Sequence, residues 1–187
     1  TFLFDKFAVF LKNNHHICRV NNQLHIYKDG IYVAEQAEIE AAMISHLPQL
    51  NKAKRSEVLA YLDVLIRNNT PVAPAHLVAF RNGLYNVLDG SFSNFTHEQV
   101  ITNKIHWDYN ATAYWQQTDE MLNNIACVDP AIRSLLEEMI GYCLFRRNEL
   151  GKAFILTGSG SNGKSTFLNL VKRMLGTQNI SVLDVKD

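Results

Sequence analysis

One stretch near the end of the chain constrains the fold more than any other: Lys152–Gly176, which reads KAFILTGSGSNGKSTFLNLVKRMLG. Within it, residues 158–165 fit the pattern GxxxxGK[ST] of a phosphate-binding loop. The apolar run AFILT precedes the loop, and an amphipathic run follows it and ends at Gly176, which suits a helix C-cap. The pattern therefore predicts a short buried strand, a glycine-rich loop and a helix, in that order.

Each fixed position of this loop has a chemical reason. Glycines allow backbone N–H groups to surround a polyphosphate, and a helix that begins near Gly163 directs its positive dipole end at the same phosphates. Lys164 is the predicted catalytic residue, because its ammonium would neutralise charge as the γ-phosphoryl group leaves. The hydroxyl of Ser165 would bind Mg²⁺. We therefore expect ATP and Mg²⁺ as cofactors, bound by Gly158, Ser159, Gly160, Ser161, Asn162, Gly163, Lys164, Ser165 and Thr166.

Phosphate binding alone does not predict hydrolysis. A P-loop ATPase also needs an acidic residue on a neighbouring strand, which holds Mg²⁺ and assists the water. Asp184 and Asp187 follow a short apolar run, but that run is very close in sequence to the loop helix. Asp184 stays open as this acid. The favoured expectation is that the acidic strand lies beyond the chain given, which starts with Thr1 in place of Met, and that this piece alone does not hydrolyse ATP.

The residues before the loop predict a mixture of helices and antiparallel strands. Short β-rich runs separated by Asn21-Asn22 and by Asp29-Gly30 indicate a small meander, since Asp-Gly suits a turn with positive φ angles. Residues 76–95 indicate a second hairpin with turns at Asn82-Gly83 and Asp89-Gly90. The helical spacing of apolar residues predicts helices at about 2–12, 36–47, 52–68, 111–126 and 130–146, the last with Pro130 in its first turn and an apolar stripe for core packing.

The charge balance offers no global case for nucleic acid, because 18 basic residues match 18 acidic ones. Trp107 and Tyr109 could stack on bases, although aromatic residues beside an apolar stretch belong more often to a core. The local basic candidates for binding DNA or a partner are Lys52, Lys54, Arg55, Arg146 and Arg147, for which solvated surface charge is the favoured interpretation.

Cysteine and histidine usage points away from a metal centre and away from secretion. Cys18, Cys127 and Cys143 have no zinc-ligand spacing and predict small buried side chains in a reducing compartment. The seven histidines are scattered along the chain without metal-ligand spacing. There is neither a signal peptide nor a run long enough to span a bilayer, so we expect a cytoplasmic protein without a membrane partner.

On these residues the chain resembles the phage and plasmid primase–helicases related to poxvirus primase, which are superfamily 3 helicases. The segment Asn162–Thr166 matches their loop, commonly GxGxNGKST. Weaker similarities follow one another in the family's order: LHIYKDGIYV at 24–33, AFRNGLYNVLDGSF at 79–92, WDYNATA at 107–113 and EEMIGYCLF at 137–145.

The resemblance implies an α+β accessory domain at 1–110, a helical linker at 111–150, and the first strand–P-loop–helix unit of an α/β, AAA+-like ATPase core at 151–187. It further implies an ATP-dependent DNA helicase of a phage, prophage or plasmid replication system. That enzyme would be active as the full-length protein, with DNA as partner and a homo-oligomeric ring, usually hexameric. Because a lone strand–loop–helix unit lacks sheet neighbours, we expect 151–187 to pack on the preceding helices, on another chain, or loosely.

Two other functions remain open at this point. One is a non-catalytic module that binds DNA or a partner, or mediates oligomerisation, and keeps only a remnant P-loop. The other is a small-molecule kinase, which is disfavoured because kinases usually begin with the P-loop strand, and here about 150 residues precede it.

Overall fold

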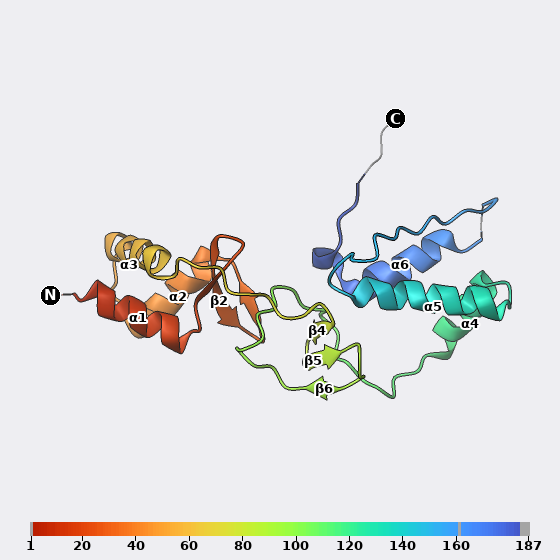
Figure 1. Cartoon of the computed structure of the whole chain (residues 1–187), viewed down its shortest axis with the longest axis horizontal. Helices are drawn as coiled ribbons and strands as arrows, with labels where there is room; N and C mark the ends of the chain where they lie inside the picture. Colours follow the sequence, from red (N-terminus) through yellow and green to blue (C-terminus); the bar gives the residue numbers. More distant parts are fainter. Residues whose placement is uncertain (1, 161, 184–187) are drawn as a thin grey trace. The chain divides into compact units, whose positions relative to one another are not determined.

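The computed structural model describes residues 2–160 and 162–183 and has a mixed α+β architecture. Its described residues form two compact units (Figure 1), one from 2–73 with 95–103, the other from 74–94 with 104–183. Each unit contains one three-stranded antiparallel sheet. None of the helices in the described ranges is both long enough and apolar enough to cross a membrane. The functional boundaries at 110 and 150 remain a prediction.

The first unit begins with the predicted helix and meander. Both tight turns of the meander have positive φ at their two central residues, 49° and 63° at Asn21 and Asn22, and 49° and 89° at Asp29 and Gly30. Asn, Asp and Gly tolerate this backbone, so local chemistry alone sets the two turns, as predicted. The elements of the unit are α1 (Phe4–Asn14), β1 (Cys18–Val20), β2 (Gln23–Lys28), β3 (Ile31–Val33), α2 (Gln36–His46) and α3 (Lys52–Leu65).

A buried arginine explains why α3 ends at Leu65 and not at the predicted residue 68. Arg19 is only 8% exposed, and its guanidinium donates to the backbone oxygens of Asn22, Asp63 and Ile66 and to the Asp63 carboxylate. A cation so far from water needs these acceptors. The carbonyl groups at the end of α3 supply two of them, and the Ile66 side chain enters the core where the helix stops.

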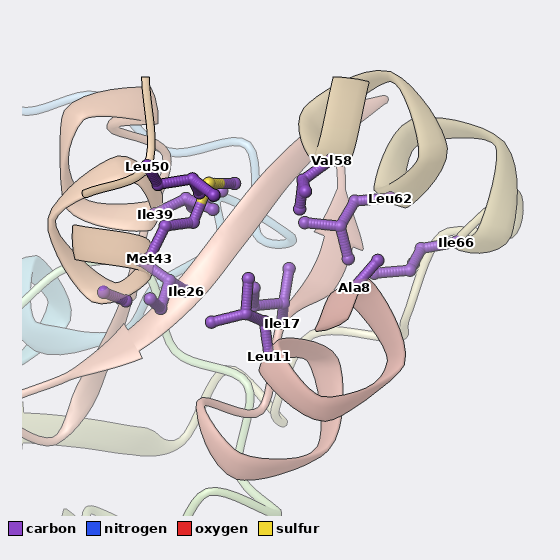
Figure 2. Close-up of a cluster of buried hydrophobic side chains, with 11 residues drawn as sticks. Ala8, Leu11, Ile17, Ile26, Ile39, Met43, Leu50, Val58, Leu62 and Ile66 are labelled. Atoms are coloured by element: carbon purple, nitrogen blue, oxygen red, sulfur yellow. The ribbon is translucent and has the colours of Figure 1, made fainter. Parts of the chain in front are cut away.

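The core of the first unit draws one apolar face from each of its helices. Figure 2 shows side chains of α1, α2, α3 and β2 directed toward one another. Burial of this apolar surface is the main source of stability for the unit. The buried cluster consists of Ala8, Leu11, Ile17, Ile26, Ile39, Ala42, Met43, Leu50, Val58, Leu62 and Ile66.

The second unit begins with the predicted hairpin, in the sheet order β4–β5–β6. Phe80 pairs with Gly83, so the turn consists of Arg81 and Asn82, and the prediction of Asn82-Gly83 was wrong by one residue. Gly83 is needed inside the strand, because an added Cβ would overlap the Ser93 carbonyl of β6. The strands are β4 (Leu77–Phe80), β5 (Gly83–Asn86) and β6 (Phe92–Ser93).

Three helices complete this unit: α4 (Gln116–Ile125), α5 (Pro130–Leu144) and α6 (Lys164–Leu175), followed by a short 3-10 turn, η1 (Thr177–Asn179). Pro130 occupies the first turn of α5, as predicted, and the Asp129 carboxylate caps this helix by accepting from two backbone N–H groups. Phe167 of α6 is 1% exposed and packs against α4 and α5. The segment after the loop therefore packs on the preceding helices, the first of the three outcomes expected (Figure 1).

Three predictions about buried residues were wrong, all of them involving this unit. Residues 153–157 form no strand and Ile155 is 85% exposed, because strand pairing requires a neighbour and no described strand lies beside them. On α5, the apolar stripe is only half buried, with Leu136 and Met139 inside and Ile132 and Leu135 exposed. Cys127 and Cys143 are also exposed, and Cys18 is half-buried, in place of three buried thiols.

Candidate phosphate-binding loop

The loop turns directly into α6 at Gly163. This glycine is the residue before the helix and has φ of 82°, a left-handed conformation that a side chain would strain. An added Cβ would also lie 2.6 Å from Cγ1 of Ile125, at the end of α4. Glycine at 163 is thus required twice, by its own backbone and by the close approach of a second helix. The helix begins where the sequence predicted.

Lys164, the predicted catalytic residue, directs its ammonium back into the loop. Its Nζ donates to the backbone oxygen of Gly158 at 3.1 Å and to Oδ1 of Asn162 at 2.6 Å. Nδ2 of Asn162 faces the α-carbon of Gly158 so closely that an added Cβ there would overlap it. The first, fifth and seventh residues of the motif therefore form one set of contacts.

The charges close to the loop in sequence favour an anion. From residue 150 to residue 183 the sequence contains Lys152, Lys164, Lys172 and Arg173 and no acidic residue. Gly163, the residue before α6, has no side chain that could cap the helix. It therefore offers no side-chain oxygen as an acceptor for the first N–H groups of α6. A helix N-terminus with an adjacent lysine and no acid nearby in sequence has the chemistry that suits a polyphosphate.

A cleft of about 890 Å³ opens beside the loop. Asn162, Lys164 and Thr166 lie at its polar end, and apolar side chains of α4 and α5 line the wall. The volume lies within the range of pockets that hold small organic ligands. The polar rim on α4 consists of Gln117, Glu120 and Asn124, which sequence reasoning missed, because nothing in the sequence indicates that α4 meets a loop almost 40 residues later.

The remaining predicted site residues are placed less distinctively. Ser159, Gly160 and Ser165 are exposed and do not line the cleft. Ser161, Asp184 and Asp187 lie outside the described residues, so the structure gives them no role. Within residues 2–160 and 162–183, no group of three or more His, Cys, Asp or Glu side chains is close enough to hold a metal ion. Ser165 as a Mg²⁺ ligand remains a prediction.

Most of the candidate basic residues for a DNA interface are engaged within the chain. Arg55 donates to Glu40, Arg147 pairs with Glu149, and Lys54 lies over the Phe2 ring. Arg146 donates to the backbone oxygens of Pro74 and Leu77, and burial lowers its pKa. Arg146 is therefore partly buried and not the solvated surface charge that was predicted, while Arg55, Arg147 and Lys54 have partners within the chain.

The two aromatic candidates for base stacking also have partners. The Trp107 indole, 58% exposed, donates to the Arg173 backbone oxygen, so it reaches the end of α6. The Tyr109 ring stacks between Tyr85 and Phe92, with ring centroids 4.5 Å and 5.0 Å away. Tyr109 therefore packs among the chain's own rings, as the favoured interpretation held, whereas the exposed Trp107 does not belong to a core.

Four of the seven histidines, scattered in sequence, meet in two pairs within the first unit. Nε2 of His15 lies 2.9 Å from Nε2 of His46, and the ring of His16 stacks on that of His97 at 3.7 Å. Burial, followed by the neighbouring His46, lowers the pKa of His15, and burial, followed by His97, lowers the pKa of His16. The pairs are 31 and 81 residues apart in sequence, which no spacing rule detects.

Comparison with known families adds an independent observation. A model described as "D5 N terminal like" matches residues 2–141, about three quarters of the chain. The chain belongs to the D5 N terminal like family. The match covers the first unit, the β4–β6 sheet and α4, with most of α5. This membership agrees with the resemblance to phage and viral primase–helicases. The P-loop lies outside the matched residues, so its assignment depends on the motif and on the geometry above.

A curated relative supports the same kinship. The Acanthamoeba polyphaga mimivirus protein named "Putative helicase L207/L206" is 28% identical over 107 residues. The alignment spans 54% of this chain but only 11% of the viral protein. Kinship with the D5 N terminal like proteins is therefore shown, while the activity, substrate and partners of a complete enzyme are matters for proposal.

Proposed function

We propose that this chain binds ATP with Mg²⁺ through residues 158–166 and that this binding drives DNA unwinding in a complete primase–helicase. The observation that carries the proposal is the geometry at Lys164. Lys164, whose ammonium donates back into the loop, lies with Asn162 and Gly163, the residue before α6, at one end of a cleft. Family membership and the similarity to a viral protein named as a helicase support the DNA-unwinding part.

In this proposal, the chain's own groups provide binding and orientation. The N–H groups at the start of α6 would donate to the phosphate oxygens, and Lys164 would neutralise the β- and γ-phosphates. The Ser165 hydroxyl would be a ligand of Mg²⁺, which supplies charge stabilisation at the transferred phosphoryl group. The apolar wall of α4 and α5 offers room for the nucleoside beside the phosphates.

A second candidate function, a non-catalytic module with a remnant P-loop, is favoured by one observation. No acidic residue occurs between Glu149 and Asp184, so this segment supplies no carboxylate that could hold Mg²⁺ with Ser165. A module of this kind could bind nucleotide without turnover, or bind none.

Calorimetric titration of the chain with ATP–Mg²⁺, with phosphate release measured in parallel, tests both. We expect Lys164→Ala to weaken binding at least about 100-fold, since it removes a charge-assisted contact. Lys172→Ala, which removes the same charge from the last turn of α6, should leave the affinity within about threefold. If the unaltered chain binds no ATP, or if the two variants bind alike, the ATP-binding proposal is wrong. Binding without phosphate release is the result expected of an ATPase site that is incomplete in this piece, whereas the absence of binding would favour the non-catalytic module.

A further inference from the structure

The side chain of Asn162 has a role beyond its place in the motif. Lys164 needs acceptors for its ammonium when no phosphate is present, and the loop supplies two neutral oxygens, Oδ1 of Asn162 and the carbonyl of Gly158. The contact to Asn162 is the shorter, at 2.6 Å. No carboxylate occurs in the surrounding sequence from 150 to 183 that could take over this role.

The orientation of the amide is well determined by chemistry. Only the oxygen of Asn162 can accept from an ammonium, so Nδ2 must point the other way, toward Gly158. The absence of a Cβ at Gly158 makes room for it. The amide is thus fitted between the lysine and the first glycine of the loop, and its identity is constrained on both sides.

We propose that Asn162 is a positioning residue, a neutral latch that holds the Lys164 ammonium at the mouth of the loop until phosphate replaces it. The inference rests on the proposed nucleotide site. Because the acceptor is neutral, it holds the ammonium in place but is easily displaced by phosphate. The lysine is then already positioned, so less conformational entropy is lost when phosphate binds. An aspartate of the same shape would retain the lysine as an ion pair and repel the incoming phosphate.

This role predicts a specific order of affinities. Asn162→Ala leaves the lysine only its longer contact to the Gly158 carbonyl and should weaken binding about tenfold. Asn162→Asp changes the shape hardly at all, yet should weaken binding by about 100-fold or more, because it adds a carboxylate beside Lys164 and the phosphates. The Asn162→Ala value carries the test, because the carboxylate of Asn162→Asp would repel phosphate whatever the role of Asn162.

The test titrates the chain and its variants with inorganic tripolyphosphate plus Mg²⁺ and, separately, with ATP–Mg²⁺. Asn169→Asp is the matched control, since it places the same added charge on an exposed position of α6 and should change the affinity by less than about threefold. Equal affinity for the chain and Asn162→Ala, with Asn162→Asp no worse than Asn169→Asp, would overturn the latch while leaving the ATP-binding proposal intact.

A second readout is independent of nucleotide. In a ¹H–¹⁵N spectrum selective for lysine ammonium groups, Lys164 should give a hydrogen-bonded Nζ signal that disappears in Lys164→Ala, which assigns it. The signal should also be lost in Asn162→Ala and kept in Asn169→Asp. If the chain binds neither ligand, the proposed function fails, and this spectrum still decides whether Asn162 holds the Lys164 ammonium in the free chain. A signal unchanged by Asn162→Ala contradicts it.

Discussion

The two units differ in how completely they bury their apolar residues. In the first, α1, α2, α3 and the meander all contribute to one cluster of eleven buried side chains. In the second, the cluster beneath α6 comprises five, while the adjacent segment 153–157 exposes Phe154 and Ile155. The β1–β3 strands have partners two residues away across tight turns, whereas residues 153–157 have no strand partner in the described chain.

This difference teaches that a strand predicted from an apolar run depends on its surroundings. The run 17–33 carries its own partner, because the turns at Asn21-Asn22 and Asp29-Gly30 fold it back on itself. AFILT reads as a buried strand of a parallel sheet, which needs neighbours brought from elsewhere in the chain. The meander of the first unit therefore forms from local signals, whereas the strand predicted at 153–157 depends on distant partners.

The largest expected effect is the difference in stability loss between truncating a buried apolar side chain of the first unit and truncating an exposed one of the second. Leu11 is 0% exposed in the first unit, and Leu11→Ala should lower the free energy of unfolding by about 2–5 kcal/mol through lost burial and a residual cavity. Ile155→Ala in the exposed segment should change it by less than about 0.5 kcal/mol. Urea denaturation followed by circular dichroism measures both. Similar losses would mean that residues 153–157 are packed in solution and that the comparison fails.

A smaller effect is expected when the arginine that donates to backbone carbonyl groups in each unit is replaced. Arg19→Met should cost about 2–3 kcal/mol, since it leaves buried carbonyl groups at the end of α3 without donors. Arg146→Met should cost less, about 1–2 kcal/mol, because it removes two backbone contacts near β4. The measurement is the same urea titration, with amide exchange to locate the loosened segment. Loss of protection confined to α5 in Arg19→Met would contradict this assignment.

The helix caps allow a closer comparison, one in each unit. Asn51 caps α3 by accepting from Lys54 N, and Asp129 caps α5 by accepting from Ala131 N and Ile132 N. Either residue changed to Ala should cost about 1 kcal/mol. In thermal unfolding, Asn51→Asp and Asp129→Asn should recover most of the loss, because both keep a capping oxygen. Failure of the rescue would show that these residues act through other contacts.

The smallest effect is a pH dependence of the first unit. Because the pKa values of His15 and His16 are lowered in the folded chain, the unfolded chain binds protons more readily below about pH 6.5. Stability should thus be full above pH 6.5 and should decline as the pH falls through the lowered values. Thermal unfolding at pH 7.5 and 5.5 tests this. His97→Gln should reduce the decline, and the matched control His106→Gln, outside both pairs, should not. A steeper decline in His97→Gln would refute the assignment.

Much of the fold follows from short-range patterns. Asp29-Gly30 specifies its turn, Asp129-Pro130 begins α5, and the glycine before Lys164 begins α6, because backbone conformation and capping involve residues only a few positions apart. The motif likewise indicated which residues of the loop could bind phosphate. These features need no knowledge of the rest of the chain.

The tertiary structure alone decided what depends on distant partners. It placed Ile125 of α4 against Gly163, gave Arg146 to the backbone beside β4, and paired His15 with His46. It left residues 153–157 unpaired, since sheet pairing depends on a neighbour that an apolar run cannot specify. The sequence by itself predicted the loop's chemistry and determined most of the local elements. The cleft, the core and the charge partners depended on the chain's long-range packing, where each contact joins residues that no local pattern links.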